Sequence, residues 1–174
     1  QGSLPRLAGL AAFREPTIAG VNLYDNPSAD PAPATHKPYW VGVCLPGGRI
    51  RNGILGKIGD LAQKYCTPGQ DAIRLTNKQN LLIINVPEAN LPALKAEMDE
   101  LGLDYNPTNF RKGCVSCTGI EFCNLAVAET KNRMIALVDQ LEATSGWYKD
   151  KIRIHFSGCP SSCGQHQIGD IGFR

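Results

Sequence analysis

Between residues 40 and 102, short apolar runs alternate with stretches in which apolar residues recur at helical spacing. These two patterns predict strands and helices in turn. Short apolar runs bounded by turn-forming residues predict strands at residues 40–45, 72–76 and 81–86. Between the first two runs, apolar residues recur at helical spacing, which predicts an amphipathic helix. These residues are Ile54, Leu55, Ile58, Leu61, Ala62 and Tyr65.

A second helix is predicted between Asn90, which can cap its start, and Gly102, which can end it. Its apolar face consists of Leu91, Leu94, Met98 and Leu101. The order strand, helix, strand, strand, helix is most of a ferredoxin-like unit, so we expect an α+β fold with a ferredoxin-like half-domain at residues 39–106. Residues 1–38 are expected to be a connector, because six prolines would interrupt any helix there.

The sequence changes character in residues 107–174. A loop with Gly and Cys, residues 113–123, precedes a long predicted helix. The core-facing side of that helix would consist of Leu125, Ala128, Ile135, Val138 and Leu141. Residues 151–157 alternate apolar and polar side chains, which predicts a half-buried strand, and a second cysteine loop, residues 158–164, follows directly. An apolar Ile-Gly-Phe stretch stands just before the last residue, so we expect residues 107–174 to be the N-terminal part of a truncated α/β domain.

Composition and charge exclude several classes of protein. With 43% apolar and 20% charged residues among 174, the chain can bury a core. Its net charge of +2 is too small to indicate binding to nucleic acid. The sequence contains neither an apolar run of about 18 residues nor a signal-peptide pattern, so we expect no membrane association. We expect a cytoplasmic protein, or a stromal one if its source is a plant or alga.

The seven cysteines are unevenly distributed, since five of them follow residue 113. An odd and crowded set is a poor disulfide framework and indicates metal or redox chemistry. Cys44, in a predicted strand, and Cys66, at a predicted helix end, are interpreted as ordinary buried residues.

Four of the remaining cysteines stand on two short loops. The loops read Cys117-Thr-Gly-Ile-Glu-Phe-Cys123 and Cys159-Pro-Ser-Ser-Cys163. Four thiolates that converge from two loops can hold an iron–sulfur cluster. Gly119 allows the first loop to turn back, and Pro160 stiffens the second. Backbone N–H groups in the loops, and at the start of the helix that follows, can donate to the sulfurs.

Zinc is the alternative metal. Cys114 and Cys117 are separated by two residues, a gap that zinc sites favour, and they could combine with Cys159 and Cys163. Spacing therefore leaves open both an iron–sulfur protein and a zinc-stapled binding module without catalysis.

Five segments resemble one family of enzymes. They read Cys-Thr-Gly-Ile-Glu-Phe-Cys-Asn-Leu-Ala-Val-Ala-Glu-Thr-Lys (117–131), Gly-Cys-Pro-Ser-Ser-Cys-Gly-Gln (158–165), Asp-Ile-Gly-Phe (170–173), Leu-Pro-Gly-Gly-Arg (45–49) and Arg-Leu-Thr-Asn-Lys-Gln-Asn (74–80). Together they resemble the assimilatory nitrite/sulfite reductases, and most of all the ferredoxin–nitrite reductases, over about residues 39–174. The chain is similar only to the C-terminal half of these pseudo-two-fold proteins.

The resemblance implies cofactors and a reaction. Cys117, Cys123, Cys159 and Cys163 would hold a 4Fe–4S cluster, and Cys163 would also bridge to the siroheme iron as its axial ligand. Electrons would come one at a time from ferredoxin or a similar donor and reduce nitrite to ammonia in a six-electron reaction, with sulfite as the alternative substrate. The partner would be the N-terminal half of the same enzyme, without which we expect the chain to be inactive or free of cofactor.

The chain departs from the family pattern at Ser161, where the family usually carries Asn beside the macrocycle. The substrate-binding Arg and Lys residues belong to the other half, so Arg74 and Lys78 are interpreted as structural counterparts rather than catalytic residues. His155 and His166 flank the second cysteine loop and could pass protons, but a structural role is the simpler interpretation.

Overall fold

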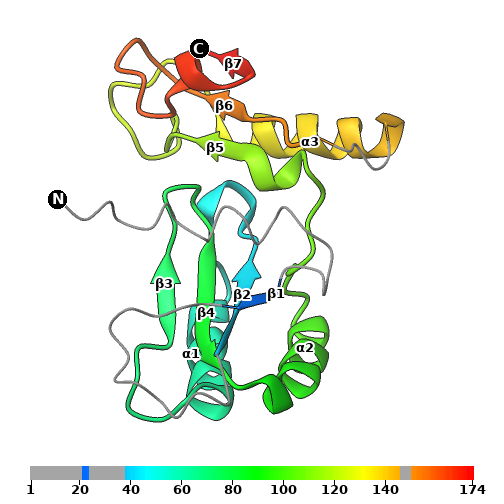
Figure 1. Cartoon of the computed structure of the whole chain (residues 1–174). Coiled ribbons are helices and arrows are strands. Elements are labelled where there is room, and N and C mark those ends of the chain that lie inside the picture. The colour runs from blue at the N-terminus through cyan, green and yellow to red at the C-terminus, as the bar shows by residue number, and fades with distance from the viewer. Residues whose placement is uncertain (1–20, 24–37, 146–149) are drawn as a thin grey trace, which may run out of the picture. The chain divides into compact units, whose positions relative to one another are not determined.

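The computed structural model describes residues 21–23, 38–145 and 150–174, shown in colour in Figure 1. The chain divides into two compact units. The first comprises the described residues up to Cys44 together with Ile50–Thr76 and Asn80–Asn106. The second comprises Leu45–Arg49, Asn77–Gln79 and the described part of Pro107–Arg174. Two short segments from the predicted ferredoxin-like stretch therefore group with the cysteine-bearing unit.

A four-stranded antiparallel sheet with the order β1-β2-β4-β3 forms the first unit. The bounds are β1 Val21–Leu23, β2 Tyr39–Val43, β3 Ile73–Leu75 and β4 Leu81–Val86. The three strands predicted from apolar runs are confirmed. Strand β1 is a correction to the predicted connector, because it pairs with β2 at the sheet edge. Its three residues contain no proline, so their backbone is free to hydrogen-bond. The rest of the predicted connector, apart from residue 38, lies outside the described residues.

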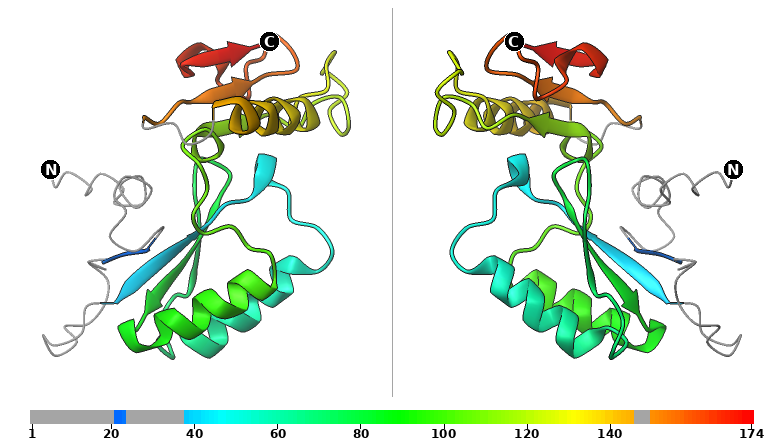
Figure 2. Two further views of the ribbon diagram at one scale, coloured as in Figure 1. Left: turned by 90° about the vertical axis from the view of Figure 1, so that its right-hand side faces the viewer. Right: turned by 90° about the vertical axis from the view of Figure 1, so that its left-hand side faces the viewer.

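Two helices, α1 Ile54–Tyr65 and α2 Leu91–Glu100, cover the same face of this sheet, as Figure 2 shows. The predicted apolar face of α1 is buried at Ile58, Leu61, Ala62 and Tyr65. Leu55 is 54% exposed and is not part of that face, because it lies in the first turn, before the buried stretch begins. Both predicted helices are confirmed.

The predicted cap of α2 is wrong, whereas its predicted end is confirmed. Asn90 has helical backbone angles and closes a short 3₁₀ helix, η3 Glu88–Asn90, without a side-chain cap. Its side-chain amide instead donates to the carbonyl oxygen of Tyr65 at 2.8 Å, which ties the start of α2 to the end of α1. Gly102 has a positive φ of 66°, which lets Leu103 N–H reach the carbonyl oxygen of Met98 at 2.9 Å.

The second unit is a three-stranded parallel sheet with the order β5-β6-β7, and one helix packs on it. The bounds are β5 Cys114–Ser116, β6 Ile154–Phe156, β7 Ile171–Phe173 and α3 Lys131–Ser145, with 3₁₀ helices at Pro46–Gly48, Arg111–Gly113 and His166–Ile168. The core consists of Phe110, Cys114, Met134, Val138, Ile154 and Phe156. Strand β6 is buried on both faces rather than half-buried, because it is the middle strand of a parallel sheet.

Helix α3 starts later than predicted. Leu125 and Ala128 lie in the loop before it, and Leu125 is 73% exposed. The carboxylate of Glu129 accepts the N–H groups of Asn132 and Arg133, each at 2.9 Å, and so caps the first turn. Burial raises the pKa of the Glu129 carboxyl, but backbone hydrogen bonds and the charge of Arg49 outweigh it and hold that pKa below its usual range. The helical spacing of the preceding apolar residues was therefore misleading.

Within the described residues, none of the helices has the length and apolar character that crossing a membrane requires.

Candidate metal centre

The two cysteine loops leave the second sheet at the same edge. Cys117 follows β5 directly, and Cys159 lies three residues after β6, which pairs with β5 in parallel. Because neighbouring parallel strands end at one edge, the loops that follow them start side by side. The N–H of Cys117 donates to the carbonyl oxygen of Phe156 at 3.0 Å and continues the ladder into the first loop.

Backbone hydrogen bonds then join the two loops. Val127 N–H donates to the carbonyl oxygen of Gly158 at 2.9 Å. In return, Gly158 N–H donates to the sulfur of Cys117 at 3.2 Å. A backbone N–H of the second loop thus donates directly to a cysteine sulfur of the first. The sequence allowed such a contact but did not show which residues make it.

The first loop turns at Gly119, as predicted. Its φ is +72°, and a Cβ atom there would lie 2.6 Å from the hydroxyl oxygen of Thr130. Its carbonyl oxygen accepts the N–H of Cys123 at 3.0 Å, which brings the second cysteine of the loop back toward the first. The side chains of Cys117 and Cys123 are both partly buried.

The second loop is tight and leaves its last cysteine at the surface. Ser162 has a positive φ of 61°, and its hydroxyl donates to the carbonyl oxygen of Pro160 at 3.0 Å. Cys159 is partly buried, whereas Cys163 is exposed. Gly164 passes under β6 so closely that a Cβ atom would lie 1.9 Å from the carbonyl oxygen of Phe156.

Cys114 is not available as a metal ligand. It lies in the hydrophobic core of the second unit, and its thiol donates to the carbonyl oxygen of Phe110 at 3.2 Å. Burial raises the pKa of its thiol to about 12, which disfavours the thiolate that a metal binds. The zinc alternative that combined Cys114 with Cys117 is therefore not supported. Cys44 and Cys66 are buried, as predicted.

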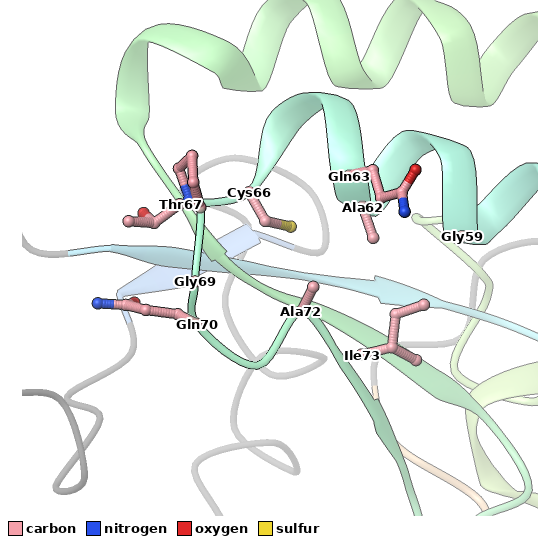
Figure 3. A pocket seen from close by; sticks show the side chains of 10 residues that line it. Gly59, Ala62, Gln63, Cys66, Thr67, Gly69, Gln70, Ala72 and Ile73 are labelled. Atoms are coloured by element: carbon pink, nitrogen blue, oxygen red, sulfur yellow. The ribbon is translucent and has the colours of Figure 1, made fainter.

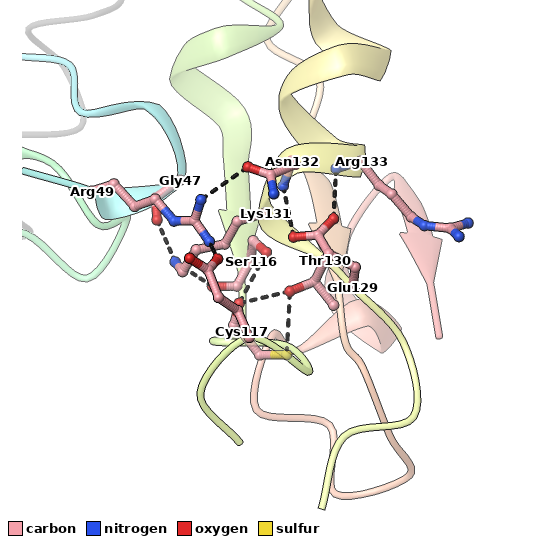
Figure 4. Close-up of polar contacts among 10 residues, drawn as sticks. Gly47, Arg49, Ser116, Cys117, Glu129, Thr130, Lys131, Asn132 and Arg133 are labelled. Atoms are coloured by element: carbon pink, nitrogen blue, oxygen red, sulfur yellow. Dashed lines mark hydrogen bonds and ion pairs between the residues drawn. The ribbon is translucent and has the colours of Figure 1, made fainter. Parts of the chain in front are cut away.

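A polar network that the sequence did not reveal holds the first loop in place (Figure 4). Lys131 Nζ donates to the carbonyl oxygen of Gly47 and to that of Ser116, the latter at 3.4 Å. Arg49 pairs with Glu121 on the first loop and donates to Asn132 on α3 at 2.9 Å. Burial lowers the pKa of the Lys131 ammonium, and the neighbouring Arg49 lowers it further.

Gln79 takes the place of a neighbouring strand at the end of β5. Its side-chain amide donates to the carbonyl oxygen of Ser116 at 2.6 Å, and its side-chain oxygen accepts Ser116 N–H at 3.0 Å. These contacts explain why Leu45–Arg49 and Asn77–Gln79 belong to the second unit. The segments 45–49 and 74–80 carried part of the family resemblance, but nothing in their spacing indicated contacts with the cysteine loops.

The other residues considered in the sequence have separate environments. Arg74 pairs with Asp71 on the surface of the first unit. Lys78 belongs to the second unit, and burial lowers the pKa of its ammonium. His155 is fully buried, and its Nδ1 lies 2.9 Å from the carbonyl oxygen of Gln165, as expected of a structural histidine. His166 is partly buried and starts a 3₁₀ helix.

The first unit contains a separate hollow of about 480 Å³ beside the C-terminal end of α1 (Figure 3). Its walls are formed by Gly59, Ala62, Gln63, Cys66, Thr67, Pro68, Gly69, Gln70, Ala72 and Ile73. The one ionisable side chain in the wall is Cys66, and burial raises the pKa of its thiol to about 11. The hollow therefore lacks groups suited to acid–base or metal chemistry.

The four loop cysteines are not gathered around one point in this structure. Across residues 38–145 and 150–174, no three Cys, His, Asp or Glu side chains converge closely enough to ligate one metal ion. Hydrogen bonds thus join the two loops, but they do not bring the cysteine side chains together as a metal site.

Comparison with known proteins shows which proteins this chain is similar to. Residues 33–101 match the family model described as the nitrite/sulfite reductase ferredoxin-like half domain. The chain is 42% identical over 133 residues to a ferredoxin–nitrite reductase of Synechococcus elongatus, across 76% of this chain and 25% of the relative. It is 40% identical over 138 residues to a sulfite reductase [ferredoxin] of Mycobacterium tuberculosis, across 77% of this chain and 24% of the relative.

A solved structure gives the same assignment. The Mycobacterium tuberculosis NirA protein superposes with a TM-score of 0.73 at 36% identity, covering 89% of this chain and 27% of that one. The chain thus spans about a quarter of the length of these relatives. By its matched half-domain, its fold and these relatives, the chain belongs to the nitrite/sulfite reductase family.

Proposed function

We propose that this chain carries the cluster-binding region of a siroheme-dependent nitrite reductase. Cys117, Cys123, Cys159 and Cys163 would hold a 4Fe–4S cluster. The observation that carries the proposal is the hydrogen bond from Gly158 N–H to the Cys117 sulfur, because it joins the two cysteine loops at the sheet edge. A backbone N–H that donates to a ligand sulfur orients that ligand and tunes its surroundings.

The residues present fit a cluster in their chemistry. Four thiols on two short glycine-containing loops match the Cys₄ ligation that such clusters use. The loop backbones are fixed by hydrogen bonds, so binding requires side-chain and local loop adjustment rather than refolding. When bound, the cluster supplies one-electron transfer, while the protein holds it and sets its surroundings.

Siroheme would bind at the exposed side of the second loop. Cys163 is exposed and so can bond a second metal centre beyond the cluster. The first loop and the residues that follow it present four exposed apolar side chains, Ile120, Phe122, Leu125 and Val127. An apolar surface of this kind beside metal ligands is suited to a macrocycle or to the missing half of a larger enzyme.

Nitrite is the proposed substrate, with ferredoxin as the electron donor. The segments Cys-Thr-Gly (117–119), Glu-Thr-Lys (129–131) and Cys-Gly-Gln (163–165) resemble nitrite-reducing members more than they resemble the bacterial sulfite reductase hemoprotein. Sulfite is the second candidate, because relatives with both names match at similar identity. Six electrons and the accompanying protons would convert nitrite to ammonia, or sulfite to sulfide.

Anaerobic reconstitution with iron and sulfide tests the cluster. We expect a brown protein with about four irons and four sulfides per chain, whose visible absorption is bleached by dithionite. A colourless protein that retains a single zinc ion after the same treatment would contradict the proposal. Metal analysis and an absorption spectrum distinguish the two results.

A chimaera tests the substrate. In it, this chain replaces the matching quarter of the Synechococcus elongatus ferredoxin–nitrite reductase. With a viologen donor we expect ammonia from nitrite at a higher kcat/KM than sulfide from sulfite, and no product from this chain alone. The reverse preference would establish sulfite instead, and ammonia production by the chain alone would refute the need for a second half.

A further inference from the structure

Thr130 lies where the two cysteine loops meet, at the residue before α3. It is 1% exposed, so its hydroxyl must find a partner within the protein. That partner is the carbonyl oxygen of Cys117, to which the hydroxyl donates at 2.8 Å. The hydroxyl oxygen also lies 3.8 Å from the sulfur of the same cysteine, as Figure 4 shows.

Glycines on both loops make room for this side chain. A Cβ atom on Gly119, in the first loop, would lie 2.6 Å from the Thr130 hydroxyl oxygen. A Cβ atom on Gly158, in the second loop, would lie 3.3 Å from the Thr130 methyl group. The hydroxyl of Thr130 thus packs against one loop and its methyl group against the other.

Helix capping does not account for Thr130. Its position before α3 would suit a capping threonine, but the carboxylate of Glu129 accepts the N–H groups of Asn132 and Arg133. The hydroxyl of Thr130 is therefore directed at Cys117 rather than at the helix.

We propose that Thr130 is a positioning residue that sets the spacing of the two cysteine loops and the direction of the Cys117 sulfur. The proposal rests on the proposed function, since its consequence is the geometry of the cluster ligands. Through Cys117 and Gly158, one side chain orients the first ligand and maintains the N–H donor to it. Such hydrogen bonding to ligand sulfur tunes the reduction potential of a cluster.

Three variants distinguish the contribution of the Thr130 hydroxyl from that of its methyl group. Thr130→Val keeps the shape and the methyl group but removes the hydroxyl, whereas Thr130→Ser keeps the hydroxyl. Thr130→Ala removes both. The matched control is Thr144→Val near the C-terminal end of α3, where an exposed hydroxyl donates to the carbonyl oxygen of Gln140 at 2.8 Å.

The first measurement uses the metal-free chain, in which alkylation rates of individual cysteines are followed by mass spectrometry. Losing the buried hydrogen bond should raise the rate at Cys117 about tenfold in Thr130→Val, and Thr130→Ser should restore most of the difference. The rate at Cys66 should not change in either variant. An unchanged Cys117 rate in Thr130→Val, or an equal rise at Cys66, would overturn the proposal.

The second measurement is the reduction potential and EPR spectrum of the reconstituted cluster. We expect both to change in Thr130→Val and to return toward wild type in Thr130→Ser, with Thr144→Val unchanged. A cluster with wild-type potential and spectrum in Thr130→Val would contradict the positioning role. If wild type takes up no iron and sulfide, the proposed function fails, and the alkylation rates still decide the role of Thr130.

Discussion

Each of the two units of this chain is stabilised internally by a different kind of contact. In the first unit, helices α1 and α2 bury apolar faces on an antiparallel sheet, and the main core residues recur at regular spacing. In the second unit, the sheet and α3 share a small core, while side chains such as Arg49, Gln79 and Lys131 fix the loops. Periodic burial therefore builds the scaffold, and specific polar contacts build the candidate site.

Adding one methyl group should give the largest difference in stability change between the two units. In Gly164→Ala the new Cβ would meet the carbonyl oxygen of Phe156, so we expect a loss of about 3 kcal/mol in the free energy of unfolding. Gly56 is an exposed position of α1, and no atom beyond the neighbouring helix backbone lies within 4 Å of the new Cβ in Gly56→Ala, so we expect a gain of about 0.5–1 kcal/mol. Urea unfolding followed by circular dichroism measures both, and equal effects would refute the close packing of the second loop.

Removing the side chain that completes β5 should have the next largest effect. Gln79→Ala loses two hydrogen bonds to Ser116, and we expect destabilisation by about 2 kcal/mol. The control Gln63→Ala changes an exposed position on α1 and should stay within about 0.5 kcal/mol of wild type. If the two variants unfold at the same urea concentration, Gln79 is not part of the sheet.

A matched pair of arginines gives a smaller contrast. Arg49 is 12% exposed and contacts both Glu121 and Asn132, so Arg49→Met should destabilise by about 1 kcal/mol. Arg74 is 49% exposed and pairs with Asp71 three residues away, so Arg74→Met should change stability by less than about 0.5 kcal/mol. Thermal unfolding of both variants checks the order, which a larger loss in Arg74→Met would reverse.

Acid should weaken the second unit slightly through Asp170. Hydrogen bonds and charge from Arg153 hold the pKa of the Asp170 carboxyl well below its usual range. Because its pKa is lowered in the folded state, the charged carboxylate stabilises the fold above the ordinary aspartate pKa. This stabilisation is lost as the pH falls below about 4. Both side chains are exposed by more than two fifths, so the effect is small. Asp170→Asn should lose this part of the acid sensitivity, and identical pH profiles for the two proteins would contradict it.

Apolar periodicity was enough to predict most of the scaffold, because burial on one face leaves a regular signal. It predicted α1, α2 and three strands, but β1 stands among prolines and has too few residues to show a period. The late start of α3 could not be predicted, because Val127 N–H donates to the carbonyl oxygen of Gly158, on a loop far away in the sequence. Similarly, spacing and the family resemblance made the four loop cysteines candidate ligands, whereas the roles of Gln79, Lys131 and Thr130 depend on contacts across the fold.

Iron and sulfide content of single Cys→Ser variants tests the central claim most directly. We expect that each single substitution, at Cys117, Cys123, Cys159 or Cys163, lowers the iron and sulfide bound after reconstitution severalfold, since each cysteine would supply one ligand. Cys114→Ser should retain wild-type content, because its thiol lies in the core. Full iron and sulfide content in variants from either loop would show that the two loops do not share a cluster.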